Sequence, residues 1–370
     1  MRQDSHNIFM LQAIKLAARA IGTTMPNPPV GALVVSKGAI VGEGYHKRAG
    51  GPHAEVFALK SAGSRARGAI LYVTLEPCST HGRTGPCTQA IIQSGIRTVV
   101  VAIRDPNPVH NGRGIATLKK AGITVIEGIC RQQAGELIKP FSKWIITGKP
   151  FLTLKLGISL DGKIADIDGR SKWITSKTSR RLVMNLRRKV DAILVGAGTA
   201  RTDNPSLLCA RERKPFRVIV DSYGSLSLDA KVLNDAYVER TIIATTEKCS
   251  KRRHLLYEKK GAQVWRLPAN KTGYVSLSSV ISRLGKNGIL HVLCEGGGEI
   301  ASGLIRQNLV DEYLIFIAPL IIGGRRSVPS VGGKGWPLYS CPRLKFTACS
   351  RSGPDIQLHA VSDVRLNRGV

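Results

Sequence analysis

The 370-residue sequence is poor in acidic residues and has no long hydrophobic run. It holds 25 Asp and Glu against 55 Lys and Arg, which gives a formal net charge of +30. A membrane-spanning helix needs about 20 consecutive apolar residues, and no segment provides them. The most apolar N-terminal stretch, residues 8–22, is interrupted by Gln12, Lys15 and Arg19. It therefore predicts an amphipathic helix, and neither a membrane span nor a signal peptide.

The excess of positive charge is spread over the whole chain. Residues 1–148 hold 18 Lys and Arg against 7 Asp and Glu, and residues 149–370 hold 37 against 18. A basic protein of this kind can bind nucleic acid, or phosphorylated small molecules such as sugar phosphates and NADPH. A solvated basic surface without a ligand explains the charge equally well, so charge alone does not decide the function.

The eight cysteines are scattered, and no secretion signal precedes them. A reducing cytoplasm, where cysteine pairs serve metals more often than disulfides, is the expected compartment. Because single hydrophobic cores seldom grow beyond roughly 250–300 residues, the chain length predicts two domains. The helical stretch 135–150, ending in Thr147-Gly-Lys-Pro150, is a candidate joint. We expect domains at 1–148 and 149–370.

Short apolar strands alternate with helical patterns in both halves, which predicts α/β folds with largely buried sheets. In the first half we expect helices at 8–22, 54–62, 87–94 and 115–121, and strands at 30–35, 40–44, 69–75, 98–103 and 124–127. In the second half we expect helices at 178–189, 275–284 and 299–307, and strands at 151–158, 192–195, 216–220, 241–244, 289–293 and 312–318.

The most informative motif is His53-Ala-Glu55, followed by Pro77-Cys78 and Pro86-Cys87. One imidazole and two thiolates form a zinc site whose fourth position is open for water, and a nearby Glu can move protons. Helix N-termini, where His53 and Cys87 are expected, favour ionised ligands. The combination is typical of zinc nucleobase deaminases.

The sequence lacks the Cys-x-x-Cys spacing that deaminases of nucleic acids and cytidine use. Here eight residues separate Cys78 from Cys87. The longer loop provides additional surface for a different substrate, which argues against a polynucleotide.

Several motifs of the first half together resemble the bifunctional riboflavin-biosynthesis deaminase/reductase family. They are Thr24-Met-Pro-Asn-Pro-Pro-Val-Gly31, Gly44-Tyr-His46, Gly50-Gly-Pro-His-Ala-Glu55, Thr74-Leu-Glu-Pro-Cys78, Gly82-Arg-Thr84 and Asp105-Pro-Asn-Pro108. The resemblance implies a cytidine-deaminase-like α/β/α sandwich in which His53, Cys78 and Cys87 hold one zinc ion and Glu55 transfers protons. It places Asn27 and His46 in the pyrimidine pocket, although Asn27 also suits a turn between prolines and His46 a surface loop.

The loop between the two cysteines departs from the family pattern. The family usually has His directly after Cys-Ser and Pro-Pro before the second Cys, whereas this chain has Thr80 and Gly85-Pro86. His81, one position later, is a candidate for the missing imidazole. Because the expected ligands and Glu55 are intact, we expect deamination to survive.

The second half lacks the Gly-x-Gly-x-x-Gly fingerprint of a Rossmann dinucleotide site. Gly296–Gly298, between an expected strand and helix, could instead receive a pyrophosphate at the helix N-terminus or form only a tight turn. Further motifs are Lys155-Leu-Gly-Ile-Ser-Leu-Asp-Gly-Lys-Ile-Ala165, Ser171-Lys-Trp-Ile-Thr175, Gly196-Ala-Gly-Thr199, Asp203-Asn-Pro205, Val218-Ile-Val-Asp-Ser222 and Glu295-Gly-Gly-Gly298.

These segments resemble the reductase half of the same family, which implies a dihydrofolate-reductase-like α/β domain that uses NADPH. The resemblance places Gly157, Trp173, Thr199, Asp203, Ser222, Gly297 and Gly298 at the cofactor. It places Ser171, Arg187, Leu207, Arg211 and Glu295 at the substrate, and gives Asp203 a catalytic role. From the residues alone, Asp203 could cap a helix, Trp173 could fill a core, and Lys155 could be a solvated strand-end charge.

One segment and one residue of this half also depart from the family. The stretch from Leu207 to Arg211 is one residue longer than usual, which shifts the Arg expected on the substrate phosphate. Met184 stands where the family commonly has His.

The resemblance implies two successive reactions on a phosphorylated pyrimidine. The first is hydrolytic removal of the 2-amino group of 2,5-diamino-6-(5-phosphoribosylamino)pyrimidin-4(3H)-one. The second is NADPH-dependent reduction of the ribosyl group of the uracil product to ribityl. It also implies a homo-oligomer formed through the reductase half, with no nucleic-acid or membrane partner. The rival hypotheses are an RNA adenosine or cytidine deaminase and a non-enzymatic basic binding protein with a degenerate zinc site.

Overall fold

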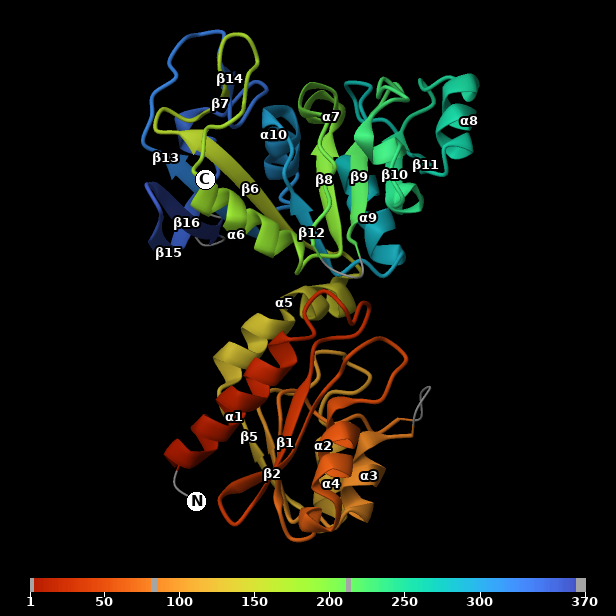
Figure 1. Cartoon of the computed structure of the whole chain (residues 1–370), viewed down its shortest axis with the longest axis vertical. Coiled ribbons are helices and arrows are strands. Elements are labelled where there is room, and N and C mark those ends of the chain that lie inside the picture. Colours follow the sequence, from red (N-terminus) through yellow and green to blue (C-terminus); the bar gives the residue numbers. More distant parts are fainter. Residues whose placement is uncertain (1–2, 81–84, 211–213, 364–370) are drawn as a thin grey trace. The chain divides into compact units, whose positions relative to one another are not determined.

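A computed structural model describes residues 3–80, 85–210 and 214–363. The chain divides into two compact units, Met1–Lys149 and Pro150–Val370. Within the described residues, no helix combines the length and apolarity needed to span a membrane. Each unit is built around its own β-sheet, with helices packed against it (Figure 1).

The first unit has a five-stranded sheet in the order β2-β1-β3-β4-β5. Strand β1 pairs antiparallel with β2 and β3, whereas β3, β4 and β5 are parallel. Helices α1 and α5 lie on one face of the sheet and α2, α3 and α4 on the other (Figure 1). The strands are β1 (Gly31–Ser36), β2 (Ala39–Tyr45), β3 (Ile70–Val73), β4 (Thr98–Val101) and β5 (Thr124–Glu127). The helices are α1 (Gln3–Ala18), α2 (Ala54–Ala62), the 3-10 turn η1 (Gly63–Ala66), α3 (Cys87–Gln93), α4 (Arg113–Lys120) and α5 (Arg131–Thr147).

The central strands β1, β3 and β4 are buried on both faces, and alternate residues of each strand point to opposite sides of the sheet. On β1, Ala32 and Val34 join the core beneath α2 and α3, whereas Leu33 and Val35 join the core beneath α1. This explains why the strands read as continuous apolar runs rather than alternating ones. The expected three-layer α/β arrangement of the first unit is confirmed.

The second unit has a nine-stranded sheet in the order β11-β10-β9-β8-β12-β6-β13-β16-β15. All neighbours from β11 to β13 are parallel, and only the terminal hairpin runs antiparallel. Its strands are β6 (Phe151–Ser159), β8 (Ala192–Gly196), β9 (Phe216–Val220), β10 (Thr241–Thr245), β11 (Gln263–Arg266), β12 (His291–Cys294), β13 (Glu312–Ala318), β15 (Leu344–Ser352) and β16 (Asp355–Ser362), and β7 (Lys163–Ala165) and β14 (Val328–Pro329) form a separate pair. The helices are α6 (Lys177–Arg187), α7 (Ala197–Asp203), α8 (Lys251–Lys259), α9 (Leu277–Lys286) and α10 (Gly298–Arg306), with 3-10 turns η2 (Lys231–Leu233), η3 (Val238–Arg240) and η4 (Leu338–Ser340).

Two further features of the fold concern the stretch 135–150 and the C-terminal hairpin. The stretch 135–150, which was expected to be helical, belongs to α5 as far as Thr147, and the helix ends where Gly148 adopts a left-handed φ of 69°. The hairpin β15–β16 was not expected from the sequence. Strand β15 is exposed along almost all of its length, so its residues show no alternation of buried and polar positions.

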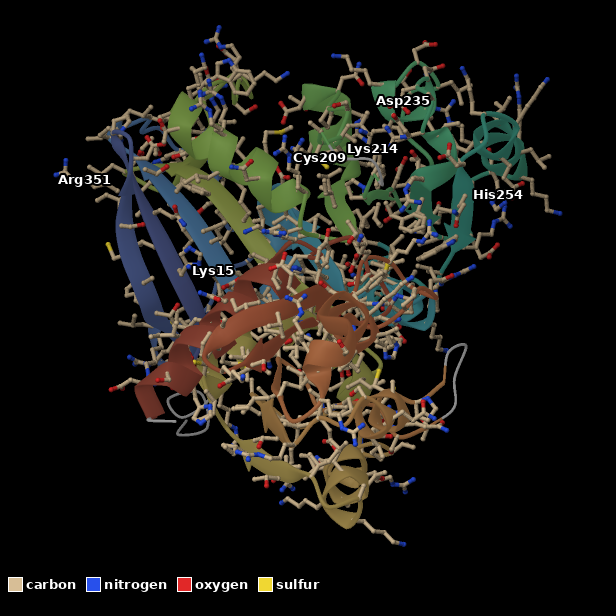
Figure 2. The ribbon with its side chains drawn as sticks, turned by 60° about the horizontal axis from the view of Figure 1, so that its bottom comes forward. Lys15, Cys209, Lys214, Asp235, His254 and Arg351 are labelled. Carbon is tan, nitrogen blue, oxygen red and sulfur yellow. The ribbon has the colours of Figure 1, made fainter. Side chains whose placement is uncertain are left out.

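A fully buried arginine anchors the loop region beside β9. Arg217 has no exposed surface, and its guanidinium pairs with Asp235 at 2.5 and 3.0 Å (Asp235 is labelled in Figure 2). The same guanidinium donates to the carbonyl oxygens of Ser206, Val232 and Tyr237. Arg217 thereby connects the segments around Ser206, Val232 and Tyr237, for which the sequence patterns predict no helix or strand.

We expect Asp235→Ala to destabilise the second unit by about 3 kcal/mol, because removing one partner leaves the buried guanidinium charge uncompensated. Denaturant unfolding of the full chain followed by tryptophan fluorescence measures this, since Trp173, Trp265 and Trp336 report on that unit. Glu247→Ala is the control, because it removes an exposed ion pair with Arg266 and should cost less than about 1 kcal/mol. Equal effects of the two substitutions would contradict a structural role of the buried pair.

Candidate active sites

The His and Cys side chains singled out in the sequence converge at one end of the first unit. His53 is the residue before α2, Glu55 lies in the first turn of that helix, and Cys87 is the first residue of α3. Cys78 lies on the segment that follows β3. Since α2 and α3 cover the same face of the sheet (Figure 1), their N-terminal residues meet.

The three expected ligand atoms form a tight cluster. His53 Nδ1 lies 3.1 Å from Cys87 Sγ and 3.5 Å from Cys78 Sγ, and all three ligand atoms lie within 4.8 Å of one another. The hydrogen bond from Cys87, together with His53, lowers the pKa of the Cys78 thiol to about 4. The hydrogen bond with Cys78 and burial raise the pKa of Cys87. One thiolate is therefore already favoured before a metal binds.

The donor set fits zinc. One imidazole nitrogen and two sulfur atoms are zinc ligands in tetrahedral sites, and three protein ligands leave one position for substrate or water. Glu55 is 3 % exposed, and burial raises the pKa of its carboxyl group. A carboxyl group with a raised pKa beside the ligand cluster is suited to accept and return a proton.

Asn27 and His46 meet beside this cluster. Asn27 Nδ2 lies 3.1 Å from His46 Nε2, and His46 Nδ1 lies 3.0 Å from the Pro52 carbonyl oxygen. Because a carbonyl only accepts, His46 carries its proton on Nδ1 and accepts from Asn27 at Nε2. The His46 ring meets the His53 ring edge-on, with centroids 5.4 Å apart. Only 2 % of His46 is exposed, so a surface-loop position for it is wrong.

Glu76 is a buried carboxylate to which the sequence analysis gave no role. It accepts hydrogen bonds from the backbone N–H groups of Asp105, Gly112 and Ile115. It thereby holds the segment 105–112 and the first turn of α4 against the Pro77-Cys78 segment. Its position inside Thr74-Leu-Glu-Pro-Cys78 could have predicted this structural role. A charged residue next to a buried strand needs hydrogen-bond partners.

The loop that departs from the family pattern is only partly described. Thr80 and Gly85 are both exposed, whereas Pro86 and Cys87 are buried. His81, the candidate substitute imidazole, and Gly82–Thr84 lie outside the described residues. The departures therefore leave the described ligand cluster intact.

The second unit contains a cavity of about 820 Å³ at the carboxyl ends of its central strands. Such a crevice is the usual ligand site of parallel α/β sheets. It brings together ten of the residues expected at the cofactor or substrate, namely Gly157, Ser171, Trp173, Arg187, Thr199, Asp203, Leu207, Glu295, Gly297 and Gly298. Ser222 does not line this cavity, and Arg211 lies outside the described residues.

Two helices begin at the cavity wall after neighbouring parallel strands. Helix α7 follows β8 through Gly196, and α10 follows β12 through Gly297 (Figure 1). A Cβ atom at Gly297 would lie 3.3 Å from Thr199 Oγ1, so glycine keeps the two turns close. Of the two, α10 is long enough to offer the positive end of its dipole, which suits a pyrophosphate. The turn therefore fits a dinucleotide despite lacking the Rossmann fingerprint.

A charged cluster occupies one end of the cavity. Arg187 forms a two-pronged ion pair with Glu295, with N–O distances of 2.6 and 3.0 Å. Burial raises the pKa of Glu295, but Arg187 and Lys155 outweigh it and hold that pKa below its usual range. Burial lowers the pKa of Lys155, which lines the same cavity. The alternative of a solvated strand-end charge for Lys155 is wrong.

Asp203 and Trp173 lie at the rim of this cavity. Ser171 Oγ donates to Asp203 Oδ1 at 2.8 Å, and Lys172 Nζ donates to the Asp203 carbonyl oxygen. Trp173 is 67 % exposed, with the Arg180 guanidinium 4.3 Å from its ring centre. A core-packing role for Trp173 is therefore excluded, and its ring is available to a ligand.

Fold and sites together define a two-domain enzyme with a zinc-type deaminase domain followed by a reductase domain. The family model "Cytidine and deoxycytidylate deaminase zinc-binding region" matches residues 3–103, and "RibD C-terminal domain" matches residues 150–358. The chain belongs to the RibD family of bifunctional deaminase/reductases of riboflavin biosynthesis. The α/β fold class expected for both halves is confirmed.

Individual relatives match nearly the whole chain. The riboflavin biosynthesis protein RibD of Bacillus amyloliquefaciens is 43% identical over 95% of both chains. That of Escherichia coli K12 is 39% identical over 97% of this chain and 99% of its own. Among solved structures, form 1 of Acinetobacter baumannii RibD has a TM-score of 0.87 at 34% identity, covering 98% of this chain and all of that one.

A deaminase/reductase of Thermotoga maritima has a TM-score of 0.85 at 36% identity, covering 98% of this chain and 99% of its own. Zinc and NADPH, the cofactors expected from the sequence, are those of the family's two domains.

Proposed function

We propose that the first unit removes the 2-amino group of 2,5-diamino-6-(5-phosphoribosylamino)pyrimidin-4(3H)-one, and that the second reduces the ribosyl group of the resulting uracil to ribityl with NADPH. The observation that carries this proposal is the presence, in one chain, of a His-Cys-Cys cluster beside a buried Glu and a cavity suited to a dinucleotide. The Thermotoga maritima relative is named as a diaminohydroxyphosphoribosylaminopyrimidine deaminase/5-amino-6-(5-phosphoribosylamino)uracil reductase.

In the first unit, His53, Cys78 and Cys87 would hold zinc. Zinc bound there supplies the Lewis acidity that activates water near neutral pH. Glu55 takes a proton from the attacking water and gives it to the departing nitrogen, so that a C–O bond replaces a C–N bond and ammonia leaves. Asn27 and His46, which are joined by a hydrogen bond, would orient the pyrimidine beside the reacting carbon.

In the second unit, NADPH supplies the hydride when bound. Gly157, Trp173, Thr199, Gly297 and Gly298 would hold it along the cavity wall. Asp203, held by the Ser171 hydroxyl, would pass on, from solvent water, the proton that accompanies the hydride at the sugar.

The substrate would lie toward the charged end of the cavity, against Ser171, Arg187, Leu207 and Glu295. Because Glu295 already neutralises Arg187, the phosphate needs a further cation. We assign this clamp to Arg211, since a guanidinium fork matches phosphate oxygens.

We further propose a cytoplasmic homo-oligomer that binds small molecules rather than nucleic acid or membranes. All eight cysteines are free thiols, which suits a reducing compartment. The edge strand β15 leaves nearly all of its residues exposed, and unpaired edges are common sites of subunit pairing.

The test is to incubate zinc-loaded protein with the diaminopyrimidine ribotide and to follow ammonia, NADPH oxidation and product mass together. We expect one ammonia and one oxidised NADPH per molecule converted, and a ribityl product. Ammonia release from tRNA, with none from the ribotide, would instead support the polynucleotide deaminase.

A further inference from the structure

Beside the cavity, the ends of two further strands carry exposed residues to which neither the mechanism nor the resemblance gives a role. Strands β8, β9 and β10 are parallel neighbours, so their carboxyl ends share one edge of the sheet. The cavity lies at the end of β8. With strands about 4.8 Å apart, the segment after β10 lies roughly 10 Å further along that edge. A dinucleotide bound at α7 and α10 can extend in this direction.

Two tyrosines stand on this edge with their rings in solvent. Tyr223 is 46% exposed and Tyr274 56% exposed, and their rings meet edge-to-face with centroids 5.9 Å apart. Their backbone is held in place, because Ser222 Oγ accepts from the Val275 N–H at 2.9 Å. Asn270 Oδ1 accepts from the Tyr274 N–H at 3.0 Å. The pair is an ordered aromatic surface on which a purine can stack.

Lys248 places a positive charge against this aromatic pair. Its Nζ lies 5.3 Å from the Tyr223 ring centre. Gly273 leaves room for this side chain, because a Cβ atom at Gly273 would come within 2.5 Å of Lys248 Nζ. Thr246 Oγ1 accepts from the Lys248 N–H and donates to the Ser222 carbonyl oxygen, which anchors this backbone. Across residues 3–80, 85–210 and 214–363, no carboxylate lies within ion-pair distance of Lys248.

The acidic residue at the end of β9 is turned inward. An acid at this position in many dinucleotide folds holds the ribose 2′-hydroxyl and so selects NADH. Asp221 is instead 1% exposed, and its carboxylate accepts from the Leu226 N–H at 2.8 Å and from Ser225 Oγ at 2.9 Å. Arg201 in turn donates to the Ser225 hydroxyl. Asp221 is therefore not placed to repel a 2′-phosphate, and Glu247, the exposed acid next to Lys248, pairs with Arg266 at 3.2 Å.

We infer that Tyr223 and Tyr274 bind the adenine of NADPH and that Lys248 binds its 2′-phosphate, which makes Lys248 the residue that selects NADPH over NADH. This inference rests on the proposed use of a nicotinamide dinucleotide by the second unit. It also gives Ser222 a role outside the cavity, because its hydroxyl and carbonyl oxygen join the segments that carry the three side chains.

The test compares the binding of 2′,5′-ADP and ADP to the full-length protein by calorimetry. We expect wild type to bind 2′,5′-ADP more tightly, and Lys248→Gln to weaken 2′,5′-ADP by roughly ten- to hundredfold, as expected for a lost hydrogen bond to a charged group. ADP affinity should not change in this variant. Tyr223→Ala should weaken both nucleotides, and Lys248→Arg should keep the preference.

Lys286→Gln is the matched control, because it removes the same charge from an exposed position at the C-terminal end of α9. It should leave both affinities unchanged. If wild type prefers 2′,5′-ADP and Lys248→Gln keeps that preference, the assignment of Lys248 is overturned while the proposed function stands. If wild type binds neither nucleotide and oxidises no NADPH, the proposed reductase function itself fails.

Discussion

Glu55→Gln is expected to slow ammonia release by roughly 10²- to 10⁴-fold, the usual contribution of a general acid–base group. The amide keeps the size of the side chain but cannot take a proton from water and return it to the leaving nitrogen. Because Glu55 is not one of the clustered ligands, zinc content should stay near one per chain. Ammonia release and metal content, measured on the same samples, separate loss of proton transfer from loss of metal.

Glu43→Gln is a suitable control for this substitution. Glu43 lies on β2 in the same unit but is exposed, so its loss should leave ammonia release unchanged. Retention of wild-type deamination by Glu55→Gln would contradict the assignment of Glu55. Loss of zinc from that variant would instead give the carboxylate a structural role.

Cys87→Ser is expected to empty the zinc site and reduce deamination by more than about 100-fold, since even outer-shell changes around metals cost 10- to 100-fold. A hydroxyl stays protonated at neutral pH and replaces a thiolate poorly. The reduction of supplied uracil ribotide should be unaffected, because the reductase residues lie on a separate unit with its own hydrophobic core. Metal analysis and the two half-reactions, assayed separately, measure these effects.

Cys130→Ser provides the comparison. Cys130 is a free, partly buried thiol of the first unit that lies outside the ligand cluster, so both activities and the zinc content should be retained. If Cys87→Ser kept its zinc and its deamination, the cluster would not be the metal site. Equal losses in both variants would indicate general damage to the first unit.

The ligand cluster could be predicted because its chemistry is local in the sequence. His53 and Glu55 share one helix start, and Cys87 begins the next helix on the same face of the sheet. Strong apolar periodicity also placed α2, β5, β9 and β13 at the bounds that the structure shows. Local pattern and tertiary packing agree in these segments, which is the condition under which sequence reasoning succeeds.

Elements with exposed or densely charged surfaces escaped prediction. Strand β15 is exposed along most of its length, and α8 carries Lys251, Arg252 and Arg253 in its first turn, so neither shows a clear apolar stripe. Both are stabilised by neighbours distant in the sequence. Propensity and periodicity do not contain that information.

The resemblance located the reductase site, but the sequence alone could not predict which of its side chains contact one another. Lys155, Arg187 and Glu295 come from segments more than 100 residues apart at the extremes, and only the parallel strands bring them together. The same holds for Ser222, whose hydroxyl binds the backbone of Val275 rather than lining the cavity. Such partners depend on strand order, which the sequence patterns did not specify.

Deamination should precede reduction, and NADPH oxidation by Glu55→Gln on the diaminopyrimidine ribotide is the measurement that tests this order. We expect wild type to oxidise NADPH with this substrate, and the variant to do so only at its residual rate of deamination. Adding the deaminated uracil ribotide should restore wild-type oxidation in the variant. Undiminished oxidation by Glu55→Gln on the diaminopyrimidine ribotide would show that reduction does not await deamination and would contradict the proposed order of the two reactions.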